Sequence, residues 1–278
     1  MAALSERDRE SASLFVDEMK AAREQRGWPQ AELAERAGYS ESAVAMVETY
    51  QRPPTMTFAK AMDRAFGTPA TFERLERRLR NLPFPASFRP FTEHETRAAV
   101  LSTYQHSLVP GLLQTADYAR AVLSTRPNTS EDEVDNLVAG RLARQAVLSR
   151  DEPPAAMLWA LIDEGVLYRP VAAPAVMHDQ LMSLVDASRR PNITIQVVPY
   201  EAGGHTGLLG SFDVAELGNR DAIVFLEDQA DGRVSEDAAT VSQVTLRFAN
   251  LRSDALPKGA SRTLIESVAK ERWKEAAP

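Results

Sequence analysis

Apolar residues recur at helical spacing through the first third of the chain. One set, Leu14, Val16 and Met19, precedes a glycine, and a second set runs over residues 58–66 and is also followed by a glycine. An apolar face that repeats every three or four residues is typical of an amphipathic helix, and a glycine after it is typical of the helix end. With further short helices between these stretches, residues 1–81 are predicted to form a small all-α domain.

The segment between the two apolar sets has the spacing of two short helices joined by a sharp turn. Ala34 is small enough for a second helix to cross close to it, and Gly38 can take the positive φ that ends the first helix. Val44 and Val47 are three residues apart, so both are expected to point inward against the first helix. This is the spacing of a helix-turn-helix, a motif whose second helix enters the major groove of DNA.

The outward side of the second helix would then be the DNA-reading face. Its residues are Ser40, which can also cap the helix, and Glu41, Ser42, Ala45, Met46 and Thr49. The face carries no Arg or Lys, although bidentate contacts from Arg to guanine are the commonest specific contacts to bases. This weakens the affinity and sequence preference that the face predicts. The alternative is a helical hairpin that only packs, but spacing and flanking helices favour DNA binding.

The segment RGWPQAELAERAGYSESAVAMVE, followed by two prolines, resembles the Cro/repressor (XRE) family of helix-turn-helix domains over about residues 12–80. The resemblance implies that Gln30 contacts a phosphate at the start of the first motif helix and that the second helix reads bases. Pro29 stands where the family usually has Ser or Thr, and the family's Gly and Arg after the Glu are replaced by the segment that ends in Arg52. We retain Arg52 as a DNA-binding candidate.

Residues 82–92 are predicted to be a linker. Their three prolines oppose a regular helix, and their three phenylalanines favour packing on the chain's own domain over a role as a partner-binding peptide.

From residue 93 onward, helix-like stretches alternate with short apolar or β-branched runs. Strands are expected at residues 156–162, 193–199, 211–217 and 222–226. Helices are expected at residues 93–107, 116–124, 130–150, 176–188, 237–252 and 261–273. The helix at 130–150 places Arg141, Arg144 and Gln145 on one face. Residues 93–278 are therefore predicted to form a mixed α/β domain with about four strands, and the whole chain an α+β multidomain protein.

Composition narrows the class of protein. The chain contains no cysteine, which excludes disulfides and thiolate metal sites and fits a cytoplasmic protein, associated with the nucleoid when it binds DNA. No apolar run of about 18 residues occurs, so no membrane span is expected. The charged N-terminus does not resemble a signal peptide.

The net charge of −7 lies entirely beyond residue 80, because the first 80 residues carry equal numbers of acidic and basic residues. Phosphate contacts are therefore expected from local clusters, which comprise Arg23, Arg26, Arg36, Arg52, Lys60 and Arg64. A neutral domain is expected to bind DNA weakly as a single copy. We therefore predict a homodimer, which would place two reading helices about 34 Å apart.

The second half also resembles a known family. The segments VPGLLQTADYARAVL, GRLARQAVL, LIDEGVLYRPV, QLMSLV, RPNITIQVVPYEAGGHTGLLGSF and IVFLED are similar, in this order, to the C-terminal domain of the actinobacterial WhiJ-like regulators. The resemblance implies a bacterial transcriptional regulator, often encoded beside a very small partner protein, the pair resembling an antitoxin and a toxin. Whether the C-terminal domain receives a small molecule or the protein partner stays open.

Candidate chemistry in the second half is sparse. Asp163 and Glu164 follow a predicted strand and could act as an acid and base pair, but a strand end with one capping carboxylate is the favoured interpretation. The four histidines lack the spacing of metal ligands, so no metal site is expected. The loop at residues 203–207 is rich in glycine but lacks the lysine and following helix of a phosphate-binding loop. Because loops after strands line pockets, the nominated ligand or partner pocket consists of Glu164, Tyr200, His205 and Glu227.

Three classes of function follow from these patterns. The first is a dimeric, sequence-specific transcriptional regulator of double-stranded DNA whose C-terminal domain dimerises and receives a signal. The second is an antitoxin-like module that neutralises a small partner protein and autoregulates its operon. An enzyme is the weakest, because no nucleophile, metal cluster or phosphate loop occurs at a credible spacing; we expect no catalytic residues and no cofactor.

Overall fold

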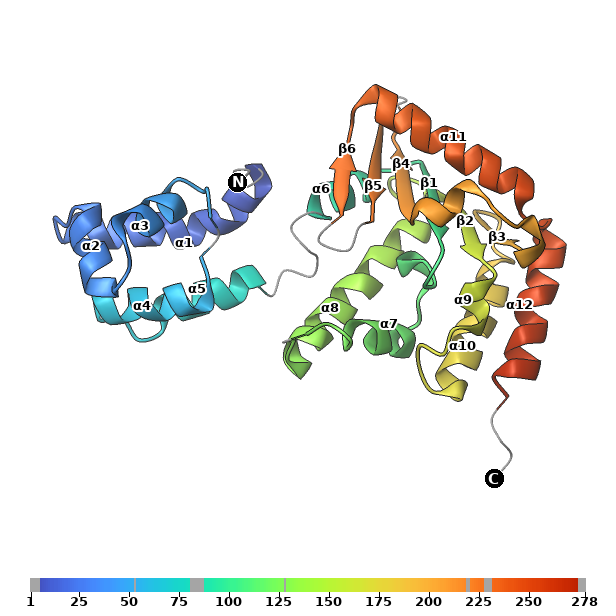
Figure 1. The fold of residues 1–278 in the computed structure, drawn as a ribbon, viewed down its shortest axis with the longest axis horizontal. Coiled ribbons are helices and arrows are strands. Elements are labelled where there is room, and N and C mark those ends of the chain that lie inside the picture. Colours follow the sequence, from blue (N-terminus) through green and yellow to red (C-terminus); the bar gives the residue numbers. More distant parts are fainter. Residues whose placement is uncertain are drawn as a thin grey trace. The chain divides into compact units, whose positions relative to one another are not determined.

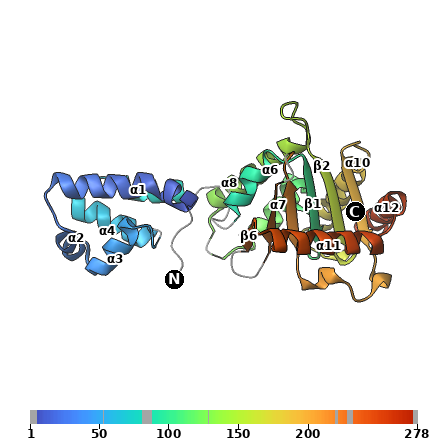
Figure 2. The ribbon, with the colours of Figure 1, turned by 90° about the horizontal axis from the view of Figure 1, so that it is seen from above.

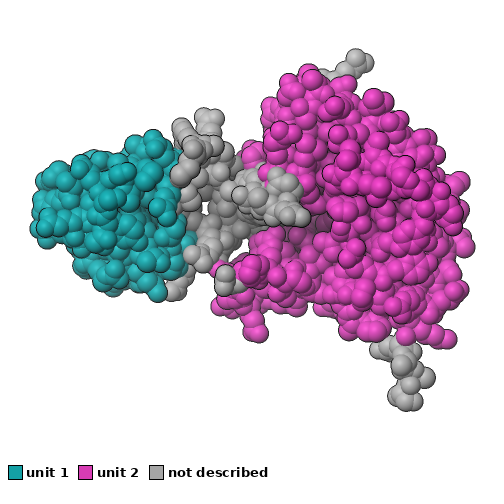
Figure 3. All heavy atoms as spheres, viewed as in Figure 1, with its two compact units in different colours: residues 1–82 teal, residues 83–278 magenta. Residues whose placement is uncertain are grey.

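The computed structural model describes residues 6–52, 54–80, 88–127, 129–218, 221–227 and 232–274 of the chain. It divides into two compact units, residues 1–82 and residues 83–278 (Figure 3). The first unit is helical and the second combines a mixed sheet with helices, which confirms the predicted α+β class. None of the described helices is both long and apolar enough to span a bilayer.

The described part of the N-terminal unit is helical (Figure 1), and its buried apolar side chains form one cluster between the helices. The helices are α1 (Glu6–Gln25), α2 (Gln30–Ala37), α3 (Glu41–Glu48), α4 (Met56–Phe66) and α5 (Thr71–Arg80). Along α1 the buried stripe is Ala12, Phe15, Val16 and Met19, which keeps the spacing of three to four residues. Leu14 lies in α1, as predicted, but its side chain is on the solvent side of the helix and is 58% exposed.

A buried carboxylate fixes the join between α4 and α5. Asp63, near the end of α4, accepts hydrogen bonds from the backbone N–H of Phe72 at 3.0 Å and of Glu73 at 2.9 Å, and from the hydroxyl of Thr68. These N–H groups belong to the first turn of α5, where helical partners are lacking. Asp63 therefore acts as the capping group of α5, and the same hydrogen bonds satisfy its buried carboxylate.

Over its described residues, the C-terminal unit is built on a six-stranded sheet with the order β3-β2-β1-β4-β5-β6. The strands β1 (Val100–Gln105), β2 (Met157–Asp163) and β3 (Ile193–Val198) are parallel to one another. The strands β4 (Phe212–Glu216), β5 (Ala222–Leu226) and β6 (Arg233–Ser235) continue the sheet in antiparallel fashion. Parallel strands need crossover connections, and these supply helices that cover the sheet.

Helices cover both faces of this sheet. Helix α11 (Ala238–Asp254) runs across the strands in Figure 2, and its Val244, Phe248 and Leu251 pack against one face. The opposite face packs against a larger cluster to which α10 (Pro174–Ala187) and α12 (Lys258–Arg272) contribute. The remaining elements of the unit are α6 (Arg89–Glu95), α7 (Ala116–Leu123), α8 (Glu131–Arg144) and α9 (Gly165–Tyr168), with short 3-10 turns at Gly111–Leu113, Gln145–Leu148, Tyr200–Ala202 and Thr206–Leu209. The result is a three-layered domain.

Most predicted elements of this unit are present, but three expectations need correction. Residues 93–107 are not one helix, because residues 100–105 form the central strand β1. Strand β6 has only three residues and was not expected. The predicted linker at residues 82–92 extends too far, because α6 begins at Arg89. Pro90 lies in the first turn of this helix, where no backbone N–H is needed. Residues 81–87 lie outside the described residues.

Phe88 and Phe91, which were expected in the linker, belong to the core of the C-terminal unit. Their ring centroids lie 5.4 Å apart, and Phe88 meets Phe225 of β5 edge-on at 4.6 Å. Both side chains are buried. The expectation that these phenylalanines pack on the chain's own domain therefore holds for the described part of the segment.

Candidate nucleic-acid interface and cavity

The turn between α2 and α3 has the geometry that its sequence predicts. Gly38 has a φ of 73°, and the backbone N–H of Tyr39 donates to the carbonyl oxygen of Ala34 at 2.9 Å, which ends α2. Ser40 caps α3 by accepting a hydrogen bond from the N–H of Ala43 at 3.2 Å. Val44 is buried against the core, as is Val47. These local signals confirm the helix-turn-helix.

The predicted reading face lies on the opposite side of α3 from these valines. Ser40, Glu41, Ser42, Thr49 and the following Arg52 are exposed, whereas Ala45 and Met46 are half-buried. The hydroxyl of Thr49 donates to the carbonyl oxygen of Ala45 at 2.7 Å and so is already used within the helix end.

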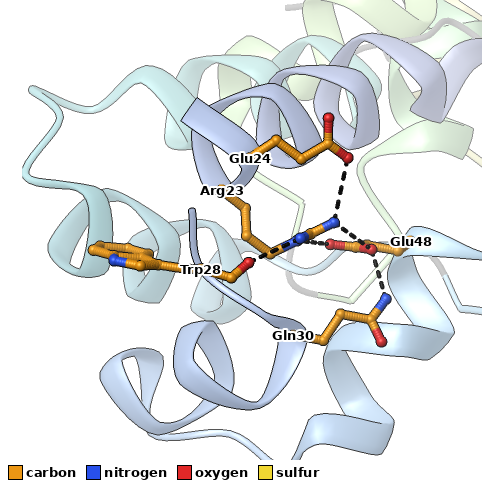
Figure 4. Close-up of polar contacts among 5 residues, drawn as sticks. All are labelled: Arg23, Glu24, Trp28, Gln30 and Glu48. Atoms are coloured by element: carbon orange, nitrogen blue, oxygen red, sulfur yellow. Dashed lines mark hydrogen bonds and ion pairs between the residues drawn. The ribbon is translucent and has the colours of Figure 1, made fainter. Parts of the chain in front are cut away.

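A buried ionic network ties the first three helices together (Figure 4). The guanidinium of Arg23 in α1 donates to Glu48 of α3, with Nε 2.8 Å from Oε1 and Nη2 3.4 Å from Oε2. The same guanidinium donates to the carbonyl oxygen of Trp28 at 2.9 Å, and it lies 3.5 Å from the exposed carboxylate of Glu24. The amide of Gln30 donates to the second carboxylate oxygen of Glu48 at 2.6 Å.

Two residues that were predicted to contact phosphate, Arg23 and Gln30, take part in this network. Arg23 was expected among the phosphate contacts, but its side chain is largely buried and is paired with a carboxylate inside the unit. Gln30 stands at the first position of α2 with its amide nitrogen already donated to Glu48, so the network fixes the orientation of its side chain. Sequence reasoning missed Glu48, whose only signal was its place at the end of the second motif helix.

Two other expected phosphate contacts also have partners within the unit. Arg36 pairs with Glu32 at 2.8 Å and lies over the ring of Trp28 at 4.3 Å. Arg26 donates to the carbonyl oxygen of Phe66 at 2.9 Å. Both arginines are exposed, so their charge remains at the surface.

Three of the four nominated pocket residues come together at the carboxyl ends of β2 and β3. A carboxylate oxygen of Glu164 accepts the backbone N–H of Tyr200 at 2.8 Å, and His205 Nε2 lies 3.6 Å from Asp163 Oδ2. Asp163 in turn accepts the N–H of Gly165 at 2.8 Å. The neighbouring carboxylates of Asp163 and Glu164 thus accept hydrogen bonds from different backbone N–H groups. This is the arrangement of a strand end with capping carboxylates, which was favoured over an acid and base pair. These residues are not among those that line a cavity between the sheet and α6–α8 of this unit.

The fourth nominated residue, Glu227, lines that cavity, which has a volume of about 250 Å³. Elements α6, β1, α7, α8, β4 and β5 all contribute to it. Much of the lining is apolar and includes Phe88, Phe91, Leu101, Leu112, Leu123, Leu137, Leu158, Val214 and Phe225. Ligand cavities in proteins commonly combine such a lining with a few polar groups.

The strand register explains how polar groups reach the cavity. Thr103 of β1 and Phe225 of β5 are both direct partners of Asp213 in β4, so the three side chains share one face of the sheet. The hydroxyl group of the facing Thr103 favours the ionised form of the Asp213 carboxyl group. Burial, followed by the nearby charge of Glu227, raises the pKa of Asp213 to about 7.

Helix α8 supplies two of the positive charges of the cavity, Arg141 and Arg144, which lie on the face that was predicted together with Gln145. Arg144 forms two hydrogen bonds of 2.6 Å with the buried Glu95 of α6. Arg141 donates to the neutral amide oxygen of Gln114 at 2.7 Å, and burial lowers the pKa of its guanidinium to about 10. Gln145 donates to the carbonyl oxygen of Gln114 at 2.7 Å and holds that segment in place.

Glu227 lies beside a short hydrogen-bonded chain. Its carboxylate is hydrogen-bonded to Ser211, whose hydroxyl lies 2.7 Å from His106 Nδ1. Burial is the main cause that raises the pKa of Glu227. Within the described ranges, no group of three or more His, Asp or Glu side chains is arranged to hold a metal ion.

Comparison with known families gives two matches along the chain. Residues 19–72 match a helix-turn-helix family of the predicted XRE type, which indicates a DNA-binding regulator. Residues 88–267, more than half of the chain, match a domain of unknown function, DUF5753. No curated protein and no solved structure matches the chain. The chain therefore belongs to the DUF5753 domain family and carries a helix-turn-helix region ahead of that domain.

Proposed function

We propose that the protein is a sequence-specific transcriptional regulator that binds double-stranded DNA as a homodimer. The observation that carries the proposal is the exposed outer side of α3, with Glu41 and Ser42 at its start, on a helix whose inner side is fixed by buried valines and by Glu48. A rigid scaffold below an exposed helix face is what reading of base edges in the major groove requires.

The charge of the N-terminal unit supports the dimeric form of this proposal. Its acidic and basic residues are equal in number over residues 1–80, and the charge of Arg23 is used in the buried ion pair with Glu48. Phosphate contacts, which supply most non-specific affinity, are therefore few for one copy. Two copies with reading helices about 34 Å apart would combine two weak half-site contacts into useful affinity.

The C-terminal unit is proposed to dimerise and to receive the signal that controls DNA binding. Its cavity supports a small molecule as that signal, because apolar walls and a few charged groups surround a volume of about 250 Å³. The ligand would act by binding one arrangement of the dimer more tightly than another. The antitoxin-like alternative requires a small protein partner instead.

The test is equilibrium binding to fluorescent DNA from the upstream region of the protein's own gene, compared with scrambled DNA across a salt series. The wild-type protein should prefer its own upstream DNA, with two half-sites about one turn apart. Replacing Ser42 or Met46 by Glu should abolish that preference without unfolding the chain, because a carboxylate on the reading face would meet phosphates and base acceptors.

The matched control is Ser124→Glu, which adds the same charge at the exposed end of α7 in the other unit. It should leave the preference intact. Equal, steeply salt-dependent binding of the wild-type protein to both DNAs would contradict sequence-specific regulation by this chain alone. Preference that survives both reading-face substitutions would contradict the role of α3.

A further inference from the structure

The charged groups of the cavity are not matched one to one. Arg144 and Glu95 neutralise each other through two short hydrogen bonds. Among the described residues, Asp213 and Glu227 have no ion pair of this kind; the hydroxyl groups of Thr103 and Ser211, respectively, favour their ionised forms, but burial raises the pKa of each. Within the described part of the chain, the side-chain hydrogen bond of Arg141 goes to a neutral amide oxygen. In the same part of the chain, Glu227 is near enough to act on Arg141 through its charge but forms no ion pair with it, so most of the guanidinium N–H groups are available to a ligand.

The chemistry of these groups favours a negatively charged ligand. A guanidinium presents its donors in a planar fork that matches a carboxylate or phosphate group. Arg126, an exposed residue that also lines the cavity, adds a second positive charge. The lining also holds the acidic residues Glu95, Asp213 and Glu227, but burial raises the pKa of Asp213 and Glu227 and so favours their neutral forms. With Glu95 paired to Arg144, the remaining charge of the lining is positive and favours anions.

The apolar part of the lining indicates what the rest of the ligand is. Phe88, Phe91 and Phe225 form a cluster with ring centroids 4.6–6.2 Å apart, and leucines and valines extend the apolar surface. Contact with such walls favours a carbon-rich body. An inorganic anion would leave this surface without a partner.

We infer that the cavity of the C-terminal unit binds a small organic anion with an apolar body, and that Arg141 holds its anionic group. The inference rests on the proposed function in one respect, because this ligand would be the signal that the C-terminal unit receives. It concerns residues of α8, β4 and the surrounding elements of one unit, and it can be tested without DNA.

Three probes of similar shape but different charge test whether the cavity selects for charge: the anion benzoate, the neutral benzyl alcohol and the cation benzylamine. Binding of each to the full chain is measured by NMR or calorimetry. Benzoate should bind, and benzyl alcohol should bind roughly 10- to 100-fold more weakly, the range expected when a charged hydrogen bond is lost. Benzylamine should bind more weakly than both. Benzoate binding should persist at high salt, because charge pairs away from solvent are little screened.

Variants then locate the anion. Arg141→Gln should weaken benzoate binding roughly 10- to 100-fold while leaving benzyl alcohol unchanged. The control is Arg120→Gln, which removes an exposed arginine of α7 that pairs with Asp135 at the surface, and it should leave both affinities unchanged. The ranking of the three probes on wild-type protein does not depend on whether the Arg141 variant folds.

Equal affinity for the three probes, tighter binding of benzylamine, or benzoate binding unaffected by Arg141→Gln would each overturn the inference. Its failure is separable from failure of the proposed function. Preference for the upstream DNA without anion selectivity refutes the ligand class alone. Anion selectivity in a chain that shows no DNA preference supports the cavity site and refutes the regulator.

Discussion

Replacing Asp213 by Asn tests whether the cavity wall really removes this carboxyl group from water. Asp213 lies in β4 opposite Thr103, and the charged groups around its carboxyl are Glu227, Glu95 and Arg144. Burial and the charge of Glu227 raise its pKa from 3.8 to about 7. Asparagine keeps a side-chain oxygen that can accept the Thr103 hydroxyl but has no charge to bury.

The sign of the effect follows from the two pKa values of Asp213. Below pH 3.8 the carboxyl is protonated in both the folded and the unfolded chain, and burial of its charge costs nothing. Between that pH and about 7 only the unfolded chain ionises, so the free energy of unfolding falls by about 1.4 kcal/mol per pH unit. Above about pH 7 both states are ionised, and the cost levels off at about 4 kcal/mol, which is an upper bound.

The variant should therefore gain stability over wild type, by about 1.5 kcal/mol at pH 5 and about 4 kcal/mol at pH 8. The change between these pH values, roughly 2.5 kcal/mol, corresponds to about 5–10 °C in melting temperature for a unit of this size. Differential scanning calorimetry of the full chain at both pH values measures it, because the calorimetric trace can resolve the transitions of the two units.

Asp186→Asn is the matched control for Asp213→Asn. Asp186 is exposed and pairs with the exposed Arg189 at 2.8 Å, so the same chemical change there should shift the melting temperature by at most about 2 °C. A difference between the Asp213 variant and wild type that stays constant from pH 5 to pH 8 would refute the reasoning. It would mean that the carboxyl of Asp213 has the same access to water in both states.

Three further substitutions test local packing. Glu48→Ala should destabilise the N-terminal unit by roughly 3–5 kcal/mol in urea denaturation, because Arg23 keeps a buried charge without its carboxylate; a loss below about 1 kcal/mol would contradict this. Gly38→Ala should cost about 1 kcal/mol in the same assay, since φ is 73° and an added Cβ meets nothing within 4 Å; a stabilised variant would contradict the left-handed turn. Gly207→Ala should lower the melting temperature of the C-terminal unit, because its Cβ would lie 2.3 Å from the Tyr104 ring, whereas Gly204→Ala, in open space, should not; equal effects would contradict the packing.

The helix-turn-helix could be predicted because its signals are local. Gly38 ends one helix, Ser40 caps the next, and Val44 and Val47 lie one turn apart, so each feature depends on residues within about ten positions. The network around Glu48 could not be predicted in this way. Its arginine lies 25 positions away in another helix, and nothing in the sequence distinguishes Arg23 from the other arginines of the unit.

The sheet and the cavity were predicted less completely, for two physical reasons. Strand β1 is buried on both faces from Leu101 to Gln105, so it lacks the alternation that marks a half-buried strand. The cavity collects residues from several elements that only the strand order brings together. The sequence did place Arg141 and Arg144 on one helix face, but Asp213, their counterpart across the cavity lining, carried no local signal.

The composition of the cavity lining argues for a binding role over a purely structural one. Burial that raises the pKa of Asp213 and lowers that of Arg141 acts against folding, and apolar residues of similar volume in the place of such groups commonly maintain or increase stability. Stabilising the fold therefore does not explain these side chains, whereas recognition of a charged ligand does. Such a ligand at 100 times its dissociation constant would add about 2.7 kcal/mol to the stability of the unit that holds it. That energy is of the size that couples ligand binding to a change elsewhere in a protein, typically about 1–3 kcal/mol. In the regulator that we propose, a ligand effect of this size would be enough to shift the arrangement of the dimer, on which DNA binding would depend because the N-terminal unit is neutral and its predicted reading face carries no arginine.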